Sequence, residues 1–292
     1  MSETEHVSVR DLRKTYGAFD AVDGISFDIG RGETFALLGP NGAGKSTTIE
    51  ILEGYRDRTS GDVTVLGQDP GRAGRDWRGR IGMVLQSSGE SGNVGVRELI
   101  AHFATFYPNP RDVDETIAAV GLTEKAGTRI RALSGGQRRR VDVALGVIGR
   151  PELLFLDEPT TGFDPEARHE FWSLIRLLKR EGTTILLTTH YLDEAAQLGD
   201  RAGVVVGGRL VALGPVDEIG GQDSRIPVVR WVDAAGQREQ RTTEPTALVA
   251  ELHRSTGGEV RSLEVIRPSL EDVYLDLVAK HDSTATPTGV LA

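Results

Sequence analysis

Short apolar runs alternate with amphipathic segments along most of this 292-residue chain. The runs have the length of strands buried on both faces, and the segments between them place apolar residues at helical spacing. Strands that alternate with helices predict a parallel sheet with crossover helices, that is, an α/β fold. The pattern extends from Val7 to about Pro215, and the strands it predicts are 34–38, 63–65, 81–84, 153–156 and 184–187.

Strands of a different kind flank the predicted parallel sheet. Residues 7–9 and 25–29 alternate apolar and polar side chains, which is the period of half-buried antiparallel strands. We therefore expect an antiparallel flap beside the main sheet. Residues 204–206 and 209–212 are separated by two glycines and predict a hairpin with a two-residue turn.

The stretch from Val96 to Val120 has a mainly helical pattern. Pro108 and Pro110 interrupt it, because proline cannot continue a helix. After Gly220-Gly221 the pattern changes to that of a compact α+β appendage with a strand at 226–232 and helices at 245–255 and 269–280. The predicted organisation is a main domain at 1–220 with a helical subdomain at about 90–150, an accessory domain at 221–281 and a disordered tail at 282–292 that is rich in Ser, Thr and Pro.

Composition and charge exclude several classes of protein. The net charge of −9 and the sequence pI near 5.3 argue against nonspecific binding to nucleic acid, which needs a basic face. The absence of cysteine excludes disulfides, thiolate metal sites and a cysteine nucleophile, and is compatible with a cytoplasmic protein. Residues 1–6 lack the basic and apolar parts of a secretory signal. Apolar runs such as 153–156 are far shorter than the roughly 18 residues of a membrane span, so we expect any membrane association to come through a partner.

A glycine-rich loop follows the predicted strand 34–38 and precedes a helical pattern at 46–52. Strand, loop and helix in this order predict a phosphate site in which backbone N–H groups wrap the phosphates. Lys45 would then reach the β- and γ-phosphates and the Ser46 hydroxyl would bind magnesium. The alternative is a glycine-rich turn with a chance lysine, which this context disfavours. The expected ATP-binding residues are Gly39, Pro40, Asn41, Gly42, Ala43, Gly44, Lys45, Ser46 and Thr47.

Two adjacent carboxylates, Asp157 and Glu158, end the apolar strand 153–156. Ligands of open α/β sheets bind at such strand ends. Asp157 is placed to hold magnesium, and Glu158 to position or deprotonate an attacking water. The alternative is an acidic helix cap.

A second short string comes just before the predicted helix 138–148: Leu133, Ser134, Gly135, Gly136 and Gln137. Its hydroxyl, glycines and helix N-terminus would present N–H groups to a γ-phosphate. A solvent-exposed helix cap is the alternative for this string on its own.

Together and in this order, the loop, the string 133–137 and the strand-end carboxylates resemble the ATP-binding subunit of an ABC transporter, over nearly all of residues 7–215. The resemblance implies a P-loop NTPase of ABC type, with a RecA-like core, an antiparallel β flap and a helical subdomain, to which the small C-terminal α+β appendage is added. It implies ATP and Mg²⁺ as cofactors. It also implies a homodimer in which each ATP lies between the phosphate loop of one copy and the string 133–137 of the other, so we refer to that string as the signature.

The resemblance assigns roles to four further residues. Tyr16 matches the aromatic residue that stacks on adenine, whereas a tyrosine on its own more often packs in the core or on the surface. Gln86 matches the glutamine that contacts magnesium and water and couples to the membrane partner; otherwise it is a polar strand end. Asp164 matches the loop exchanged between the two copies, where Phe163 replaces the usual leucine and is expected to alter packing more than chemistry. His190 matches the histidine that contacts the γ-phosphate and orders Glu158; a purely structural histidine and a metal ligand are the weaker alternatives.

The resemblance also implies a function: an ATP-hydrolysing motor that binds a separate transmembrane permease at the cytoplasmic face of a bacterial cell membrane, as a peripheral protein that binds no nucleic acid. Residues 267–275 resemble the C-terminal extension of daunorubicin-resistance-type exporters, so we expect export of a drug, antibiotic or other hydrophobic compound. The alternatives are export of a lipid or polysaccharide, a soluble ABC ATPase that acts on the ribosome or DNA, and a regulatory module that does not hydrolyse ATP. The single ATPase unit without a long coiled coil disfavours the ATPase that acts on the ribosome or DNA. The presence of Glu158 and His190 disfavours the regulatory module.

Overall fold

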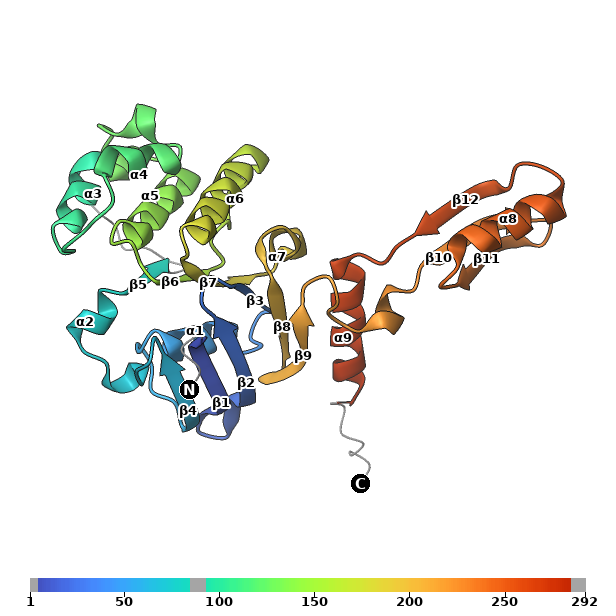
Figure 1. Ribbon diagram of the computed structural model, residues 1–292, viewed down its shortest axis with the longest axis horizontal. Helices are drawn as coiled ribbons and strands as arrows, with labels where there is room; N and C mark the ends of the chain where they lie inside the picture. Colours follow the sequence, from blue (N-terminus) through green and yellow to red (C-terminus); the bar gives the residue numbers. More distant parts are fainter. Residues whose placement is uncertain (1–4, 85–92, 285–292) are drawn as a thin grey trace, which may run out of the picture. The chain divides into compact units, whose positions relative to one another are not determined.

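The computed structural model describes residues 5–84 and 93–284, except for the side chains of 282–284 (Figure 1). The chain divides into two compact units, 1–214 and 215–292. The predicted boundary at Gly220 therefore lies inside the second unit. There Gly220 packs closely on a helix, since a β-carbon on this glycine would lie 2.2 Å from Cγ1 of Val273. The glycine pair at which the sequence pattern changes is thus partly a packing site.

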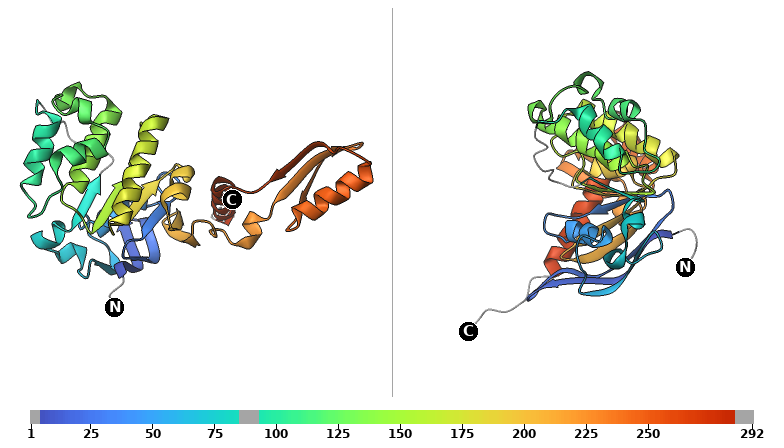
Figure 2. Two further views of the ribbon diagram at one scale, coloured as in Figure 1. Left: turned by 45° about the horizontal axis from the view of Figure 1, so that its top comes forward. Right: turned by 90° about the vertical axis from the view of Figure 1, so that its left-hand side faces the viewer.

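A six-stranded sheet forms the centre of the first unit, with the strand order β5-β6-β7-β3-β8-β9 (Figures 1 and 2). The pairs from β5 to β8 are parallel. Every residue of β3, β6 and β7 is buried, which explains why these strands are continuous apolar runs in the sequence. The strands are β3 (Thr34–Leu38), β5 (Ile81–Val84), β6 (Leu153–Asp157), β7 (Thr184–Thr189), β8 (Arg201–Val206) and β9 (Arg209–Pro215).

Helices connect and cover these strands (Figure 2). Helix α1 contacts β6, and α7 contacts β3 and β7. Because the strands are parallel, their carboxyl ends and the loops that follow them lie together at one end of the sheet. The helices of this part are α1 (Lys45–Leu52), α2 (Arg75–Arg78), α6 (Pro165–Arg180) and α7 (Leu192–Leu198).

The expected antiparallel flap is a second sheet with the order β2-β1-β4. Its strands are β1 (Glu5–Tyr16), β2 (Phe19–Gly30) and β4 (Ser60–Val65). The predicted strand 63–65 thus belongs to the flap, where it pairs antiparallel with β1, and not to the parallel sheet. β1 and β2 are longer than their alternating patterns predict, because shifts in register between Val9 and Arg13 interrupt the strict alternation. The rings of Phe27 and Phe35 stack 5.0 Å apart and join the flap to the main sheet.

The helical subdomain lies between β5 and β6. Helix α3 (Val96–Ala104) and helix α4 (Val113–Ala119) lie on either side of the two prolines, and α5 (Gly135–Val147) follows. Asp112 caps α4 by accepting bonds from the N–H groups of Asp114 and Glu115. Helix α5 begins three residues before the predicted Arg138, since Ser134 caps it.

The second unit contains a three-stranded antiparallel sheet, in the order β11-β10-β12, and two helices. β10 (Val228–Asp233) and α8 (Pro245–Thr256) are close to the predicted strand and helix. β11 (Gly236–Arg241) is exposed and polar, so no apolar alternation predicts it. β12 (Arg261–Ile266) alternates polar and apolar residues over 262–265, but it is not among the predicted strands. Helix α9 extends over Leu270–Thr284; the predicted disordered tail at 282–292 is thus wrong in its first three residues, and 285–292 lie outside the described residues.

Within 5–84 and 93–284, the structure contains no helix with the length and apolar character that crossing a bilayer requires.

Candidate nucleotide-binding site

The glycine loop connects β3 to α1, and it is packed too closely for side chains at two positions. A β-carbon on Gly39 would lie 2.3 Å from the carbonyl oxygen of Val205, and one on Gly44 would lie 2.2 Å from that of Ala21. Gly44 also has φ +101°, a left-handed conformation that glycine adopts without strain. At these two positions the loop is therefore held close to the backbone of β8 and β2, and only glycine fits.

Lys45 begins α1 and is 6% exposed. Its ammonium donates hydrogen bonds to the carbonyls of Gly39 (2.7 Å) and Pro40 (3.1 Å), which use two of its three donors. Burial lowers the pKa of Lys45, while the negative charges of Glu158 and Asp157 oppose that shift. A cation is thus held at the centre of the loop with two carboxylates nearby.

Asp157 is the last residue of β6 and is 9% exposed. The hydroxyl of Thr188 on the adjacent strand β7 donates to its carboxylate. Thr188 also fixes the next residue, because the N–H of Glu158 donates to the carbonyl (3.2 Å) and hydroxyl (3.1 Å) of Thr188. Glu158 has φ +47°, an uncommon conformation for a residue other than glycine, so its side chain leaves the strand direction at this point.

His190 directly follows β7, and its Nδ1 lies 3.4 Å from Oε2 of Glu158. The Glu158 side chain is 13% exposed and that of His190 is 42% exposed, so the imidazole covers the carboxylate while remaining accessible itself. The His190 ring packs on Tyr191, with centroids 4.1 Å apart. Lys45, Asp157, Glu158 and His190, which are far apart in the sequence, therefore meet at the ends of three adjacent strands.

The signature residues begin α5 and form a capping box. The N–H of Gln137 donates to Oγ of Ser134 (3.2 Å), and the N–H of Ser134 donates to the Gln137 side chain (3.0 Å). Leu133 is buried, whereas Ser134 and Gly135 are exposed. The first turn of α5 and the loop 161–164 line an open cavity of about 580 Å³. The signature thus forms the cap of α5, and the capping residues also line this cavity.

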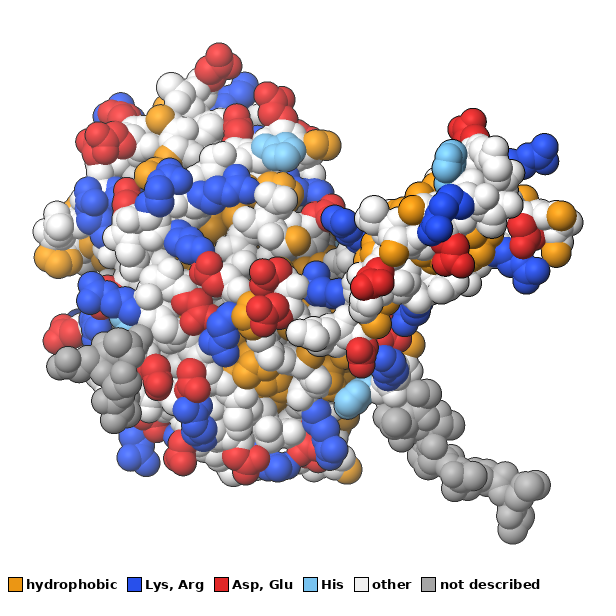
Figure 3. All heavy atoms as spheres, turned by 45° about the vertical axis from the view of Figure 1, so that its right-hand side comes forward, with side chains coloured by type: hydrophobic (Ala, Val, Ile, Leu, Met, Phe, Trp, Pro, Cys, Tyr) orange, Lys and Arg blue, Asp and Glu red, His pale blue; other side chains and the backbone are white. Residues whose placement is uncertain are grey.

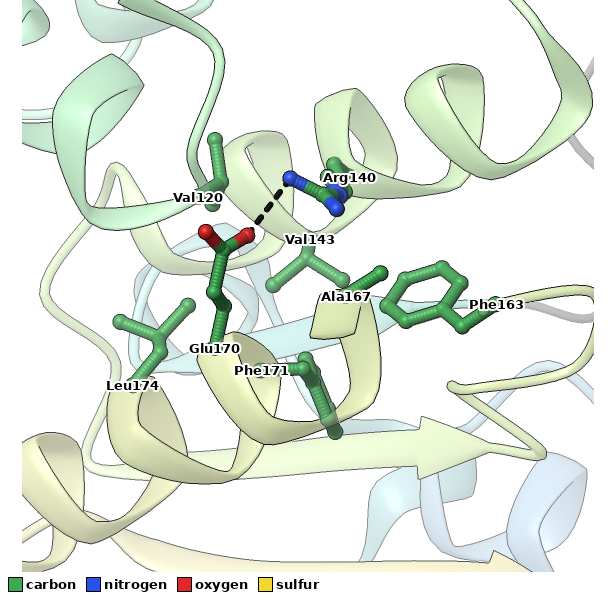
Figure 4. Close-up of a pocket in the computed structure, with 8 residues that line it drawn as sticks. All are labelled: Val120, Arg140, Val143, Phe163, Ala167, Glu170, Phe171 and Leu174. Carbon is green, nitrogen blue, oxygen red and sulfur yellow. Dashed lines mark hydrogen bonds and ion pairs between the residues drawn. The ribbon is translucent and has the colours of Figure 1, made fainter. Parts of the chain in front are cut away.

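Asp164 caps α6 by accepting a bond from the N–H of Ala167 (2.8 Å). The preceding Phe163 packs edge-on against Phe171, with centroids 6.0 Å apart (Figure 4). Arg140 of α5 lies over the Phe163 ring at 5.9 Å and forms an ion pair with Glu170 of α6 at 2.8 Å (Figure 4). The phenylalanine thus fills a contact between α5 and α6, in line with the packing role expected for it.

Tyr16 ends β1 and is 41% exposed. The Lys14 ammonium and the Arg56 guanidinium lie 5.0 Å and 5.5 Å from the centre of its ring. Both cations lie over the ring, in cation–π contact with it, so a base that stacks on Tyr16 would have to displace at least one of them. Gln86 lies outside the described residues.

Ser46 and Asp157 line one cavity of about 610 Å³, together with Glu53. A hydroxyl and a carboxylate are oxygen ligands of the kind that Mg²⁺ prefers, and nucleotide phosphates and water complete its coordination in such sites. Among the described residues there is no group of three or more Asp, Glu, His or Cys that could hold a metal ion by themselves.

Three buried residues at this site carry no sequence signal that marks them. Thr188 is one of several strand threonines, Arg139 is the middle of three consecutive arginines, and Glu53 follows an ordinary helical pattern. Burial, with Asp157 and Glu50 nearby, raises the pKa of Glu53 to about 8. Each of them is identifiable only from its contacts across the fold.

The fold and the glycine loop define the chain as a P-loop ATPase. Residues 22–161 match the family described as ABC transporter. The chain is 37% identical to the Nod factor export ATP-binding protein I of Ralstonia nicotianae, over 96% of each chain. It is 36% identical to the daunorubicin/doxorubicin resistance ATP-binding protein DrrA of Streptomyces peucetius, over 94% of this chain and 92% of that protein. The dimeric structure of MJ0796, a bacterial ABC transporter cassette, has a similar fold, with a TM-score of 0.63 and 23% identity over 72% of this chain and 98% of that one.

The chain therefore belongs to the ABC transporter family, as an ATP-binding and ATP-hydrolysing subunit. The predicted fold class is confirmed.

Proposed function

We propose that this ABC ATPase works as a homodimer, in which each ATP lies between the glycine loop of one copy and the signature of the other. The observation that carries the proposal is the separation of the two half-sites in one chain. Ser46 and Asp157 line one cavity, the residues Ser134–Gln137 line another, and these cavities share no lining residue among the described parts of the chain. A second copy can bring the two halves together, and MJ0796, a relative in fold, has been solved as a dimer.

The residues of each completed site divide the work of hydrolysis. Lys45 and the loop N–H groups hold the β- and γ-phosphates, and Tyr16 stacks on the adenine. Mg²⁺, held by Ser46 and Asp157, supplies charge neutralisation at the phosphates when bound; Gln86, by the family resemblance, completes this set. Glu158 orients the attacking water and accepts its proton, while His190 holds Glu158 in place and contacts the γ-phosphate. Asp164 faces the partner copy.

ATP binding then favours the closed dimer and hydrolysis releases it, which gives a mechanical stroke to an attached partner. That partner is a separate transmembrane permease, and the chain is peripheral at the cytoplasmic face of the membrane. The names of the relatives, one for Nod factor export and one for daunorubicin/doxorubicin resistance, support outward transport. The cargo class that we propose is a drug, antibiotic or other hydrophobic compound.

The mixed surface disfavours an ATPase that acts on nucleic acid. On the face shown in Figure 3, basic and acidic side chains are interspersed over the unit 1–214 rather than gathered into a basic stripe.

Shared sites are tested by mixing two inactive variants. Lys45→Ala removes phosphate binding by the loop, and Ser134→Arg blocks the signature. A dimer of one chain of each kind contains one intact composite site of two. Because random pairing of an equal mixture makes half of the dimers mixed, the mixture should regain up to about a quarter of the activity of the normal protein. No regained turnover in chains shown by sedimentation to associate would refute the shared arrangement. Transport of a candidate cargo into membrane vesicles with the co-purified permease tests the exporter assignment separately.

A further inference from the structure

Arg139 lies in the first turns of α5 and is 7% exposed, and its guanidinium reaches across to the end of β6. Nη2 donates to the carbonyl of Asp157 at 2.6 Å and to that of Glu158 at 3.3 Å. Nε donates to the carbonyl of Pro159 at 3.2 Å. One planar side chain therefore contacts three successive carbonyls of the segment that carries the candidate water-directing carboxylate.

That segment is conformationally unusual. Glu158 has φ +47°, a strained conformation for a residue with a β-carbon, which persists only when the surroundings impose it. Its N–H is held from one side by Thr188 of β7 at 3.2 Å. Arg139 holds the carbonyls from the other side, so the backbone at Glu158 is fixed between a strand and a helix.

The three consecutive arginines of α5 make different contacts. Arg138 is exposed and donates to Leu133 in the loop before its own helix (2.9 Å), and Arg140 pairs with Glu170 of α6. Arg139 alone of the three contacts the end of β6 in the described structure. Burial lowers the pKa of Arg139, and the charges of Asp142, Asp157, Glu158 and Glu194 oppose that shift, so a buried cation is retained here at a desolvation cost.

We propose that Arg139 is a positioning residue for hydrolysis, which holds the backbone of Glu158 in its left-handed conformation. The inference rests on the proposed function of Glu158. It has a further consequence, because α5 also presents the signature to the nucleotide bound by the partner copy. The N-terminus of α5 thus contributes to one composite site, and Arg139 of the same helix positions Glu158 in the other composite site.

The first experiment replaces Arg139 by lysine, which keeps the positive charge but cannot span three carbonyls with one planar group. We expect Arg139→Lys to lower kcat about tenfold or more, to change KM less than about threefold, and to leave ATP binding at equilibrium intact. Arg97→Lys is the matched control, since Arg97 is an exposed arginine of the helical subdomain paired with Asp114 at 2.6 Å. It should leave kcat and KM unchanged.

The second experiment asks in which site Arg139 acts. When Arg139→Lys chains are mixed with Ser134→Arg chains, the one complete site uses the glycine loop, Glu158 and normal Arg139 of the Ser134→Arg chain. Activity should therefore rise well above the sum of the separate variants. When Arg139→Lys chains are mixed with Lys45→Ala chains, the one complete site uses Glu158 of the Arg139→Lys chain, and activity should stay low.

Equal activity of the two mixtures would overturn the proposal, as would a normal kcat for Arg139→Lys. A loss of equilibrium ATP binding in Arg139→Lys, with restoration in neither mixture, would assign Arg139 to folding and likewise overturn it. The mixture of Lys45→Ala with Ser134→Arg separates the test of the shared site from the test of Arg139. If that mixture regains no activity, the shared-site arrangement is wrong, whatever the role of Arg139.

Discussion

Thr188 provides the sharpest test of the geometry at the end of the sheet. It is fully buried, and its hydroxyl donates to the carboxylate of Asp157 while accepting from the N–H of Glu158. Thr188→Val keeps the shape and removes the hydroxyl. The N–H of Glu158 keeps its bond to the Thr188 carbonyl, but the buried carboxylate of Asp157 loses a donor. A hydrogen bond to a charged group contributes about 1.5–3 kcal/mol, so the free energy of unfolding should fall by about 2–3 kcal/mol.

Thr183→Val is the matched control. Thr183 is also buried, but its hydroxyl donates only a long bond, 3.4 Å, to the carbonyl of Pro151, so its loss should cost less than about 1 kcal/mol. Both variants are measured by urea unfolding in a Trp231→Phe background. There the fluorescence comes from Trp77 and Trp172, which are buried in the first unit. Equal losses for the two threonines would refute the reasoning, because it attributes the difference to the charge of Asp157.

Three further predictions concern other parts of the site. The pKa of Glu53 is about 8 in the folded protein, against an unfolded value near 4.5. Without Mg²⁺ and nucleotide, the free energy of unfolding should therefore fall by up to several kcal/mol as the pH rises from about 4.5 to 8. Urea unfolding of Glu53→Gln over the same pH range should not show this fall. Gly44→Ala should weaken ATP binding at least about tenfold, because the left-handed backbone strain of about 1–2 kcal/mol adds to the close contact with Ala21. Gly74→Ala is the control: its β-carbon meets no atom within 4 Å, so this variant should bind ATP normally in calorimetry. Normal binding by both variants would contradict the loop geometry. Phe163→Leu should lower the free energy of unfolding by about 1 kcal/mol, since it loses the ring contact with Phe171, and an unchanged urea midpoint would show that this contact adds nothing.

The sequence predicts the parts of this protein whose physics is local. The buried strands β3, β6 and β7 are continuous apolar runs, and the glycine loop needs its glycines at fixed spacing, so both are visible without a structure. The shape of the flap was less predictable, because its register shifts break the alternation on which strand prediction depends. β11 is not predictable for a related reason: its side chains are exposed and polar, so it is defined by pairing with β10 rather than by apolar residues. β12 carries only a short alternation, at Leu263 and Val265, and it too is defined mainly by pairing with β10.

The supporting residues of the site were not predictable in the same way. Arg139 differs from Arg138 and Arg140 only in the direction in which a helix turns it, and Thr188 acquires its role from β6, which lies next to it through the crossover topology. Residues that could contact a ligand are recognisable in the sequence from the spacing of their motifs. Residues that position them are recognisable only in the folded structure.

The central claim is that two chains share each ATP, and it is tested most directly by turnover per chain over a dilution series, with the mass of the particles measured at each concentration. Turnover should follow the fraction of chains in ATP-bound dimers and vanish as the protein becomes monomeric. Full turnover by particles of monomer mass, at every dilution, would contradict the account.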